Sequence, residues 1–215
     1  MNYKTVYRGG QGEIEEKKSR FIANVLPISN EEEALSFLAK IKKQYWDARH
    51  NCFAYTVGKN YELQRCSDDG EPSGTAGRPM LDVLTREGIH DCIVIVTRYF
   101  GGTLLGTGGL VRAYQKATQE GLANSVVIEK MPGRQLTITT DYNGIGKIQY
   151  LIAKNNITTI DTCYTDTVEL EVMIPIDNFD TFCAEVTEST SGRAKLEAKN
   201  PVEFAVVDGK IVLFS

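Results

Sequence analysis

The sequence lacks several features that would assign it to a class at once. Its 215 residues include five cysteines without CxxC spacing, two histidines and one tryptophan. An odd number of scattered cysteines is typical of a protein with reduced thiols, not of one held together by disulfides. No run approaches the ~20 apolar residues of a membrane span, and the N-terminus has no apolar signal-peptide core. These absences predict a cytoplasmic protein with no membrane partner.

The charge of the chain is small and unevenly distributed. The formal net charge is −4. Residues 1–133 carry 17 basic and 16 acidic side chains, whereas residues 134–215 carry 7 basic and 12 acidic ones. Proteins that coat nucleic acid by bulk electrostatics are strongly basic, so this class is excluded. Any contact with phosphate is expected from a local patch in the first part.

The apolar pattern of the first part predicts an α+β domain. Cys92 to Val96 is apolar throughout, which is typical of a strand buried on both faces. Ser29, with Glu32 as its capping partner, is expected to begin a helix. Pro79 suits the first turn of another helix, which Gly88 ends. The expected elements are strands within 3–28, a helix over about 29–45, a hairpin of 51–58 and 62–66, a helix over about 79–88, a strand at 92–96 and a helix over about 110–121.

The second part predicts a separate ferredoxin-like domain. Met131-Pro132-Gly133 is read as a turn, and the domains are therefore placed at 1–133 and 134–215. Alternating and helical patterns then follow in the order β-α-β-β-α-β, which is the ferredoxin-like order.

Residues 65–79 form an unusually polar stretch with almost no bulky apolar side chain. Three carboxylates, Asp68, Asp69 and Glu71, lie between Arg65 and Arg78. Asp-Gly and Pro-Ser-Gly are turn signals. Long loops of this kind in compact domains are usually functional. The stretch is therefore predicted to be an ordered loop beside a site, with a mobile connector as the alternative.

Residues 98–112 form a second unusual stretch, rich in glycine, between the apolar strand and a helix. Unpaired amides at a helix N-terminus attract anions, and Arg98 and Arg112 flank them. The stretch lacks the third glycine of the dinucleotide fingerprint, because Val111 stands there, and it has no P-loop lysine. Tight turning and close packing of helix on sheet are the alternative interpretation.

Several residues are candidates for metal binding or proton transfer. The 68–71 carboxylates are suited to magnesium, but pairing with nearby arginines or loop amides is the favoured interpretation. His50 and Cys52 lack the second pair that zinc requires. No metal and no cofactor is therefore expected. His50 is the candidate proton-transfer group near the loops, and Tyr99, Phe100 and Tyr114 are candidates for base stacking or core packing.

The two stretches together resemble the signatures of the IMPACT family, in particular its bacterial YigZ-type members. The matching segments are SDDGEPSGTAGRP at 67–79, RYFGGTLLGTGGLVRAY at 98–114 and ARHNCFAY at 48–55. The resemblance implies a first domain similar to the fourth domain of elongation factor G, a ribosomal-protein-like β-α-β fold, and a tail similar to that factor's fifth domain.

The resemblance also implies a link to translation. Eukaryotic members are translation regulators that compete for the activator of a kinase acting on an initiation factor. They carry an extra partner-binding domain that this sequence does not show. What carries over is therefore the link to translation and a shared surface made by the two loops.

Two main functions remain open from the sequence, beside a third, a protein-interaction module whose acidic tail docks a basic partner. The leading one is a non-enzymatic binding protein whose loops contact RNA, the ribosome or a translation-associated protein. The alternative is an enzyme that holds a small phosphorylated or carboxylated substrate with the glycine-rich loop, Arg98 and Arg112, with His50 or Asp69 as base. In both, the two segments are expected to converge on one arginine-edged pocket. The predicted binding residues are Arg65, Asp68, Asp69, Glu71, Arg78, Arg98, Tyr99, Gly101, Gly102, Gly106, Gly108, Gly109 and Arg112.

Overall fold

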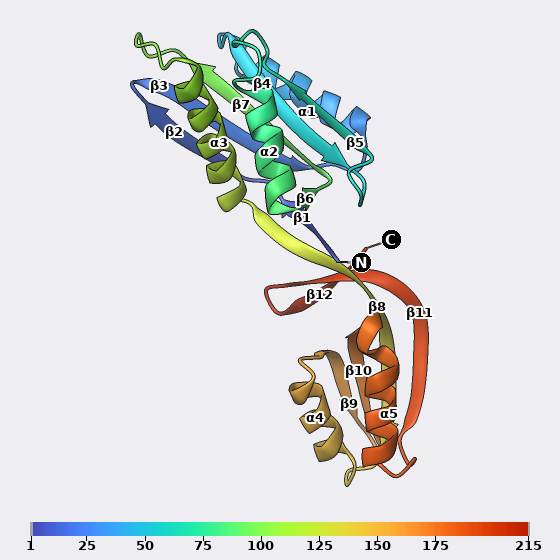
Figure 1. Ribbon diagram of the computed structural model, residues 1–215. Helices are drawn as coiled ribbons and strands as arrows, with labels where there is room; N and C mark the ends of the chain where they lie inside the picture. Colours follow the sequence, from blue (N-terminus) through green and yellow to red (C-terminus); the bar gives the residue numbers. More distant parts are fainter. Residues whose placement is uncertain (1, 215) are drawn as a thin grey trace. The chain divides into compact units, whose positions relative to one another are not determined.

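The computed structural model describes residues 2–214 and divides the chain into two compact units (Figure 1). The N-terminal unit comprises Tyr3–Ile128, and the C-terminal unit begins at Glu129 and includes Asn2. Each unit contains both helices and sheet, which confirms the expected α+β fold in two domains. Within the described residues, no helix is both long and apolar enough to cross a bilayer.

The N-terminal unit is built on an antiparallel sheet of five strands. Their order across the sheet is β2 (Gln11–Glu16), β3 (Ser19–Pro27), β7 (Cys92–Tyr99), β4 (His50–Val57) and β5 (Leu63–Ser67). The central strand β7 has no exposed surface from Cys92 to Val96, as its unbroken apolar run predicted. A separate parallel pair joins β1 (Tyr3–Arg8) to β6 (Ile89–His90).

Helices cover both faces of this sheet (Figure 1). On one face, α3 (Thr107–Ala123) packs against alternate residues of β3, including Phe21 and Ala23, and α2 (Gly77–Glu87) packs beside α3 against β4. On the other face, α1 (Glu31–Gln44) packs against Tyr55 and Ile93. This arrangement buries both faces of β7 and so accounts for its apolar sequence.

The ends of these helices follow from local residues. Gly88 ends α2 in the left-handed conformation, with φ of 69°, as expected. The start of α1 differs from the prediction by one residue. The side chain of Asn30, not Ser29, accepts from the Glu33 backbone N–H at 2.9 Å, and Glu33 in turn accepts from the Ser29 N–H at 2.7 Å. Both residue types cap helices, so the sequence alone does not choose between them.

The C-terminal unit is ferredoxin-like. Strands β8, β9, β10 and β11, with helices α4 and α5, follow the order β-α-β-β-α-β, and β12 adds an edge strand. All neighbouring strands are antiparallel, in the order β9-β10-β8-β11-β12. The bounds are β8 (Val126–Thr140), α4 (Ile145–Lys154), β9 (Thr158–Tyr164), β10 (Val168–Pro175), the 3₁₀ turn η1 (Ile176–Asn178), α5 (Phe179–Ser189), β11 (Lys195–Val207) and β12 (Lys210–Phe214).

Met131, Pro132 and Gly133 do not form the predicted turn. They continue β8 and pair with β11, where Gly133 lies opposite Val202. A Cβ on Gly133 would overlap the ring of Phe204. The glycine therefore permits close packing, and cross-strand pairing overrides the local turn preference.

Candidate functional site

The two unusual segments meet at one end of the N-terminal unit. Antiparallel pairing places the start of β4 beside the end of β7, where His50 lies opposite Arg98. There, Arg98 Nη1 donates to both carboxylate oxygens of Glu71, at 2.7 and 3.0 Å. The two side chains are only 8% and 3% exposed. This buried ion pair fixes the 65–79 loop against the 98–112 segment.

Two further buried side chains extend this contact. Tyr114 of α3 donates to Glu71 Oε1 at 2.8 Å. The Cys52 sulfur lies 2.9 Å from the Asp68 carbonyl oxygen and 3.3 Å from the Tyr114 hydroxyl. Burial raises the pKa of the Cys52 thiol to about 12, although the hydrogen bond with Tyr114 opposes the shift. The thiol therefore stays protonated and serves packing rather than nucleophilic chemistry.

Asp68 supports the start of α2 from within the loop. Its carboxylate accepts from the backbone N–H groups of Gly74, Ala76 and Gly77 at 2.8, 3.0 and 2.9 Å. Burial alone would raise the pKa of this carboxyl, but the three backbone hydrogen bonds outweigh it and hold the pKa below its ordinary value. Asp68 therefore replaces a cap that Ala76, the residue at the N-cap position, does not provide.

Asp69 is also engaged in internal contacts. One carboxylate oxygen accepts from the Asn51 N–H at 2.8 Å and the other from Lys42 Nζ at 3.0 Å. Of the three carboxylates, only Asp68 binds loop amides, as the favoured interpretation expected. Glu71 pairs with Arg98 instead of Arg65 or Arg78, and Asp69 binds partners outside the loop. Across residues 2–214, no group of three His, Cys, Asp or Glu side chains is placed to hold a metal ion.

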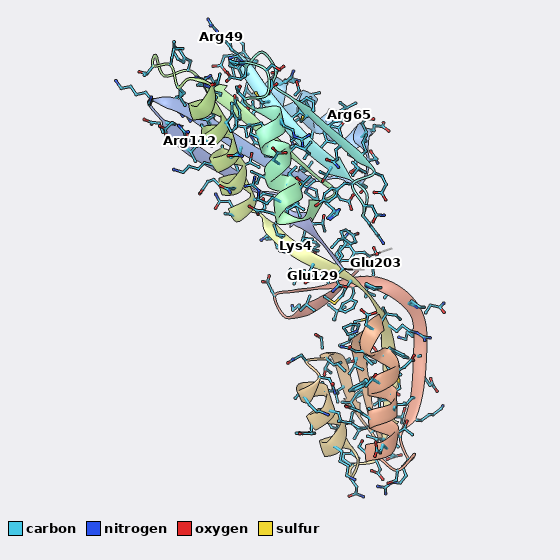
Figure 2. All side chains as sticks on the ribbon, in the orientation of Figure 1. Lys4, Arg49, Arg65, Arg112, Glu129 and Glu203 are labelled. Carbon is cyan, nitrogen blue, oxygen red and sulfur yellow. The ribbon has the colours of Figure 1, made fainter. Side chains whose placement is uncertain are left out.

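The four predicted arginines do not edge one pocket. Arg65 lies on β5, with Nε 4.0 Å from Glu31, and Arg78 pairs with Asp82 at 2.8 Å. Arg112 lines a separate cavity of about 250 Å³ with residues of α3. Figure 2 shows Arg65 and Arg112 apart from one another on the N-terminal unit. The expected clamp of Arg98 and Arg112 is therefore wrong, because β7 and α3 direct the two side chains into different cavities.

The glycines of the second segment serve mainly the backbone path. A Cβ on Gly101 would overlap the backbone of Lys18, and the Gly101 N–H donates to Ser19 Oγ at 3.1 Å. Gly102 and Gly106 have φ of 86° and 71°, which favour glycine. Gly108 and Gly109 lie in the first turn of α3. Close approach and turning thus account for Gly101, Gly102 and Gly106, in line with the alternative interpretation.

A cavity of about 520 Å³ lies at this end of the unit. We call residues 46–50 and 98–104, which surround it, the loop end. The buried side chain of Arg98 forms part of the cavity wall. Phe100 and Leu104 of the second segment also line the cavity, and their side chains are 55% and 82% exposed. The full lining is Asp47, Arg49, His50, Arg98, Tyr99, Phe100 and Leu104.

Three lining residues, Asp47, Arg49 and Leu104, were not singled out from the sequence. Asp47 accepts from the Tyr99 hydroxyl at 2.7 Å and so joins the turn after α1 to β7. Burial, together with this carboxylate, raises the pKa of Tyr99 to about 12. Arg49 is exposed at the loop end (Figure 2), and no ion pair or hydrogen bond holds it within the described part of the chain. Arg49 lies within the 48–55 segment that resembles the IMPACT family, and this resemblance could have identified Arg49 as a site residue.

His50 also lines this cavity. Its Nδ1 lies 3.0 Å from the Asp69 carbonyl oxygen. A carbonyl oxygen only accepts, so Nδ1 carries the proton in the neutral ring and Nε2 keeps its lone pair. Of the three aromatic residues proposed for stacking, Tyr114 is fully buried and Phe100 is the most exposed.

Comparisons with known proteins agree with this two-unit architecture. Residues 17–122 match the Impact N-terminal domain, and residues 138–193 match a domain of unknown function, DUF1949. The chain is 42% identical to the IMPACT family member YvyE of Bacillus subtilis, over 91% of this chain and 90% of that protein. It is 36% identical to the IMPACT family member YigZ of Escherichia coli, over 85% and 90%. A crystal structure described as a hypothetical protein is 32% identical, with a TM-score of 0.58 over 93% of this chain and 98% of that one.

Proposed function

The chain belongs to the IMPACT family, and from this premise we propose that it is a non-enzymatic protein that binds single-stranded RNA at the loop end. The role would be linked to translation, as the family resemblance implies. RNA is preferred to a protein partner because the loop end combines exposed apolar side chains with a free guanidinium group.

The observation that carries the proposal is the set of exposed apolar side chains around the cavity. Phe100 is 55% exposed and Leu104 is 82% exposed, and both line the cavity. Trp46, which directly precedes Asp47 of the lining, is 82% exposed. Large apolar groups gathered on a surface mark binding sites. Aromatic rings beside a cationic groove are the platform on which unpaired bases stack.

The charge of the loop end supports local rather than bulk electrostatic binding. Arg49 has no acidic partner within the described residues, and Arg98 is neutralised by Glu71. The N-terminal 133 residues are nearly neutral overall. Binding would therefore release few counterions, and affinity would come mainly from stacking and shape.

The test is RNA binding by the full chain, measured as fluorescence anisotropy of a short labelled oligouridylate. Replacing Phe100 by alanine should raise the Kd, because each stacked base contributes about 1–3 kcal/mol. Tyr150→Ala is the matched control, since Tyr150 is a 68% exposed aromatic residue of α4 in the other unit. An unchanged Kd for Phe100→Ala, or an equal loss in the control, would contradict the proposal.

One observation favours a second candidate, an enzyme acting on a small phosphorylated or carboxylated substrate. His50 lines the cavity with a tautomer that leaves Nε2 able to accept a proton. Thermal unfolding in the presence of nucleotides and sugar phosphates tests it. A metabolite that raises the melting temperature of the wild type but not of Arg49→Ala would support the enzyme.

A further inference from the structure

Resting on the proposed RNA binding, we propose that Arg98 binds one phosphodiester group of that RNA through its Nε and Nη2 atoms. The base of the adjoining nucleotide would then stack on Phe100. The proposal concerns one side chain and one chemical group, so it can fail while RNA binding itself stands.

The hydrogen bonds of Arg98 leave one edge of its guanidinium group unused. Nη1 alone donates to both oxygens of Glu71, at 2.7 and 3.0 Å. Nε is buried and has no partner, and Nη2 makes no hydrogen bond within the described residues. Nε and Nη2 lie on the same side of the group. Their parallel N–H bonds form the fork that matches two oxygens of a phosphate or carboxylate.

An unsatisfied donor of this kind is unusual. Buried polar atoms nearly always have a hydrogen-bond partner, and one that lacks it destabilises the fold. Within residues 2–214, only Asn24 Nδ2, Tyr61 Oη and Arg98 Nε are in this state. Among these three, Arg98 is the residue that lines the loop-end cavity. Its side chain is 8% exposed and is held in place by Glu71, so the unused edge is fixed before a ligand arrives.

Phe100 lies close to the Arg98 guanidinium group. The Arg98 Cζ atom lies 5.7 Å from the centre of the Phe100 ring and 5.5 Å from that of Phe21. Phe21 is fully buried, whereas Phe100 is more than half exposed. The Phe100 ring can therefore shift without disrupting the core. A shift of this ring would give a phosphate access to Nε and would offer the neighbouring base an aromatic face.

The charges around the cavity favour a singly charged group. Arg98 is balanced by Glu71, and Arg49 and Asp47 line the same cavity with opposite charges. A doubly charged phosphate monoester would bring two uncompensated charges, but a phosphodiester brings one. The ligand inferred is therefore an internal phosphodiester and not a phosphorylated end.

The direct test follows the Arg98 Nε–H signal of the wild-type full chain by ¹H–¹⁵N NMR, with Arg98→Lys used only to assign it. Saturating oligouridylate should move this signal downfield and slow its exchange with water. The Nε–H of Arg78, whose Nε is already ion-paired with Asp82 at 2.8 Å, is the matched control and should not move. RNA binding with an unmoved Arg98 signal would overturn this inference alone. Absence of any RNA binding would overturn the proposed function as well.

A second measurement separates the possible sources of the phosphate. Oligouridylates carrying one uncharged methylphosphonate linkage should bind the wild type normally, except at one position where affinity falls about tenfold. No sensitive position would contradict the inference. Inorganic phosphate, added alone, should leave the Arg98 signal unmoved; a shift as large as that with RNA would overturn the assignment to an RNA linkage.

Discussion

Glu71 and Arg98 form a buried ion pair in which a single guanidinium nitrogen contacts both carboxylate oxygens, at 2.7 and 3.0 Å. The two residues are 27 positions apart in the sequence, and the pair joins the 65–79 loop to the end of β7. It gives the loop end a rigid inner wall, and it leaves Nε and Nη2 of Arg98 without a hydrogen-bond partner within residues 2–214.

Removing Glu71 should strongly destabilise the N-terminal unit. Glu71→Ala leaves Arg98 buried without a counter-charge, which costs about 3–5 kcal/mol. The matched control is Glu13→Ala, which breaks the half-exposed pair with Arg20 at 2.7 Å and should cost about 0–1 kcal/mol. Urea unfolding of both variants measures the difference. Similar losses in the two variants would show that the buried pair has no special structural role.

Asp68→Asn should weaken the start of α2. The amide offers one acceptor oxygen in place of the two that serve three backbone N–H groups, so a loss of about 1–2 kcal/mol is expected, as for other caps. Asp82→Asn, in the exposed pair with Arg78, is the control and should change stability by at most about 0.5 kcal/mol.

The effect of Asp68→Asn should depend on pH. The carboxyl has a lower pKa in the folded chain than its ordinary value. Its contribution is therefore complete above the unfolded pKa of about 4 and is lost as the pH falls through the folded pKa. The difference in unfolding free energy between wild type and variant should stay constant as the pH falls from about 7. It should then shrink as the pH approaches about 3. A gap that widens toward acid would contradict the assignment.

Gly101 and Gly108 should respond in opposite ways to alanine. A Cβ on Gly101 would overlap the Lys18 backbone, whereas one on Gly108 would meet only the end of Arg112, at 3.6 Å. Gly101→Ala is expected to cost about 1–3 kcal/mol through overpacking. Gly108→Ala, inside α3, should be neutral or stabilise by up to about 1 kcal/mol. Thermal unfolding tests both. A Gly101→Ala variant as stable as the wild type would contradict the close approach.

The cysteines report whether the network around Glu71 opens in solution. With its pKa raised to about 12, the buried Cys52 thiol should resist iodoacetamide in the native protein. The exposed Cys163 is the internal control and should be alkylated quickly, while the buried Cys92 should resist alkylation as Cys52 does. Mass spectrometry of the digested protein gives the three rates. Alkylation of Cys52 as fast as that of Cys163 would mean that the loop is open.

Much of the fold could be predicted because its signals are local. The unbroken apolar run from Cys92 to Val96 identified the central strand, and Pro79 with Gly88 located α2. The alternating and helical apolar patterns of the second part predicted the ferredoxin-like order of strands and helices. The turn predicted at Met131-Pro132-Gly133 is wrong because pairing with β11 overrides the local turn preference. Only the folded chain provides that contact.

The candidate site was less accessible from the sequence, since its contacts are long-range. That the two loops meet was expected, but the choice of Glu71 as the partner of Arg98 depends on the register of β4 against β7. Asp68 acts as a cap across a loop, which no short motif describes. Exposure of Trp46 and Leu104 could not be inferred, because apolar residues are expected in the core.

The most direct test of RNA binding at the loop end is its salt dependence in the wild type and in Arg49→Ala. Anisotropy titrations with labelled oligouridylate at several salt concentrations give the slope of log K against log salt. If Arg49 contacts one phosphate, the variant should bind more weakly and its slope should be smaller by about 0.7. Arg65→Ala, on β5, should leave both values unchanged. RNA binding with the same affinity and slope in Arg49→Ala as in the wild type would contradict the account.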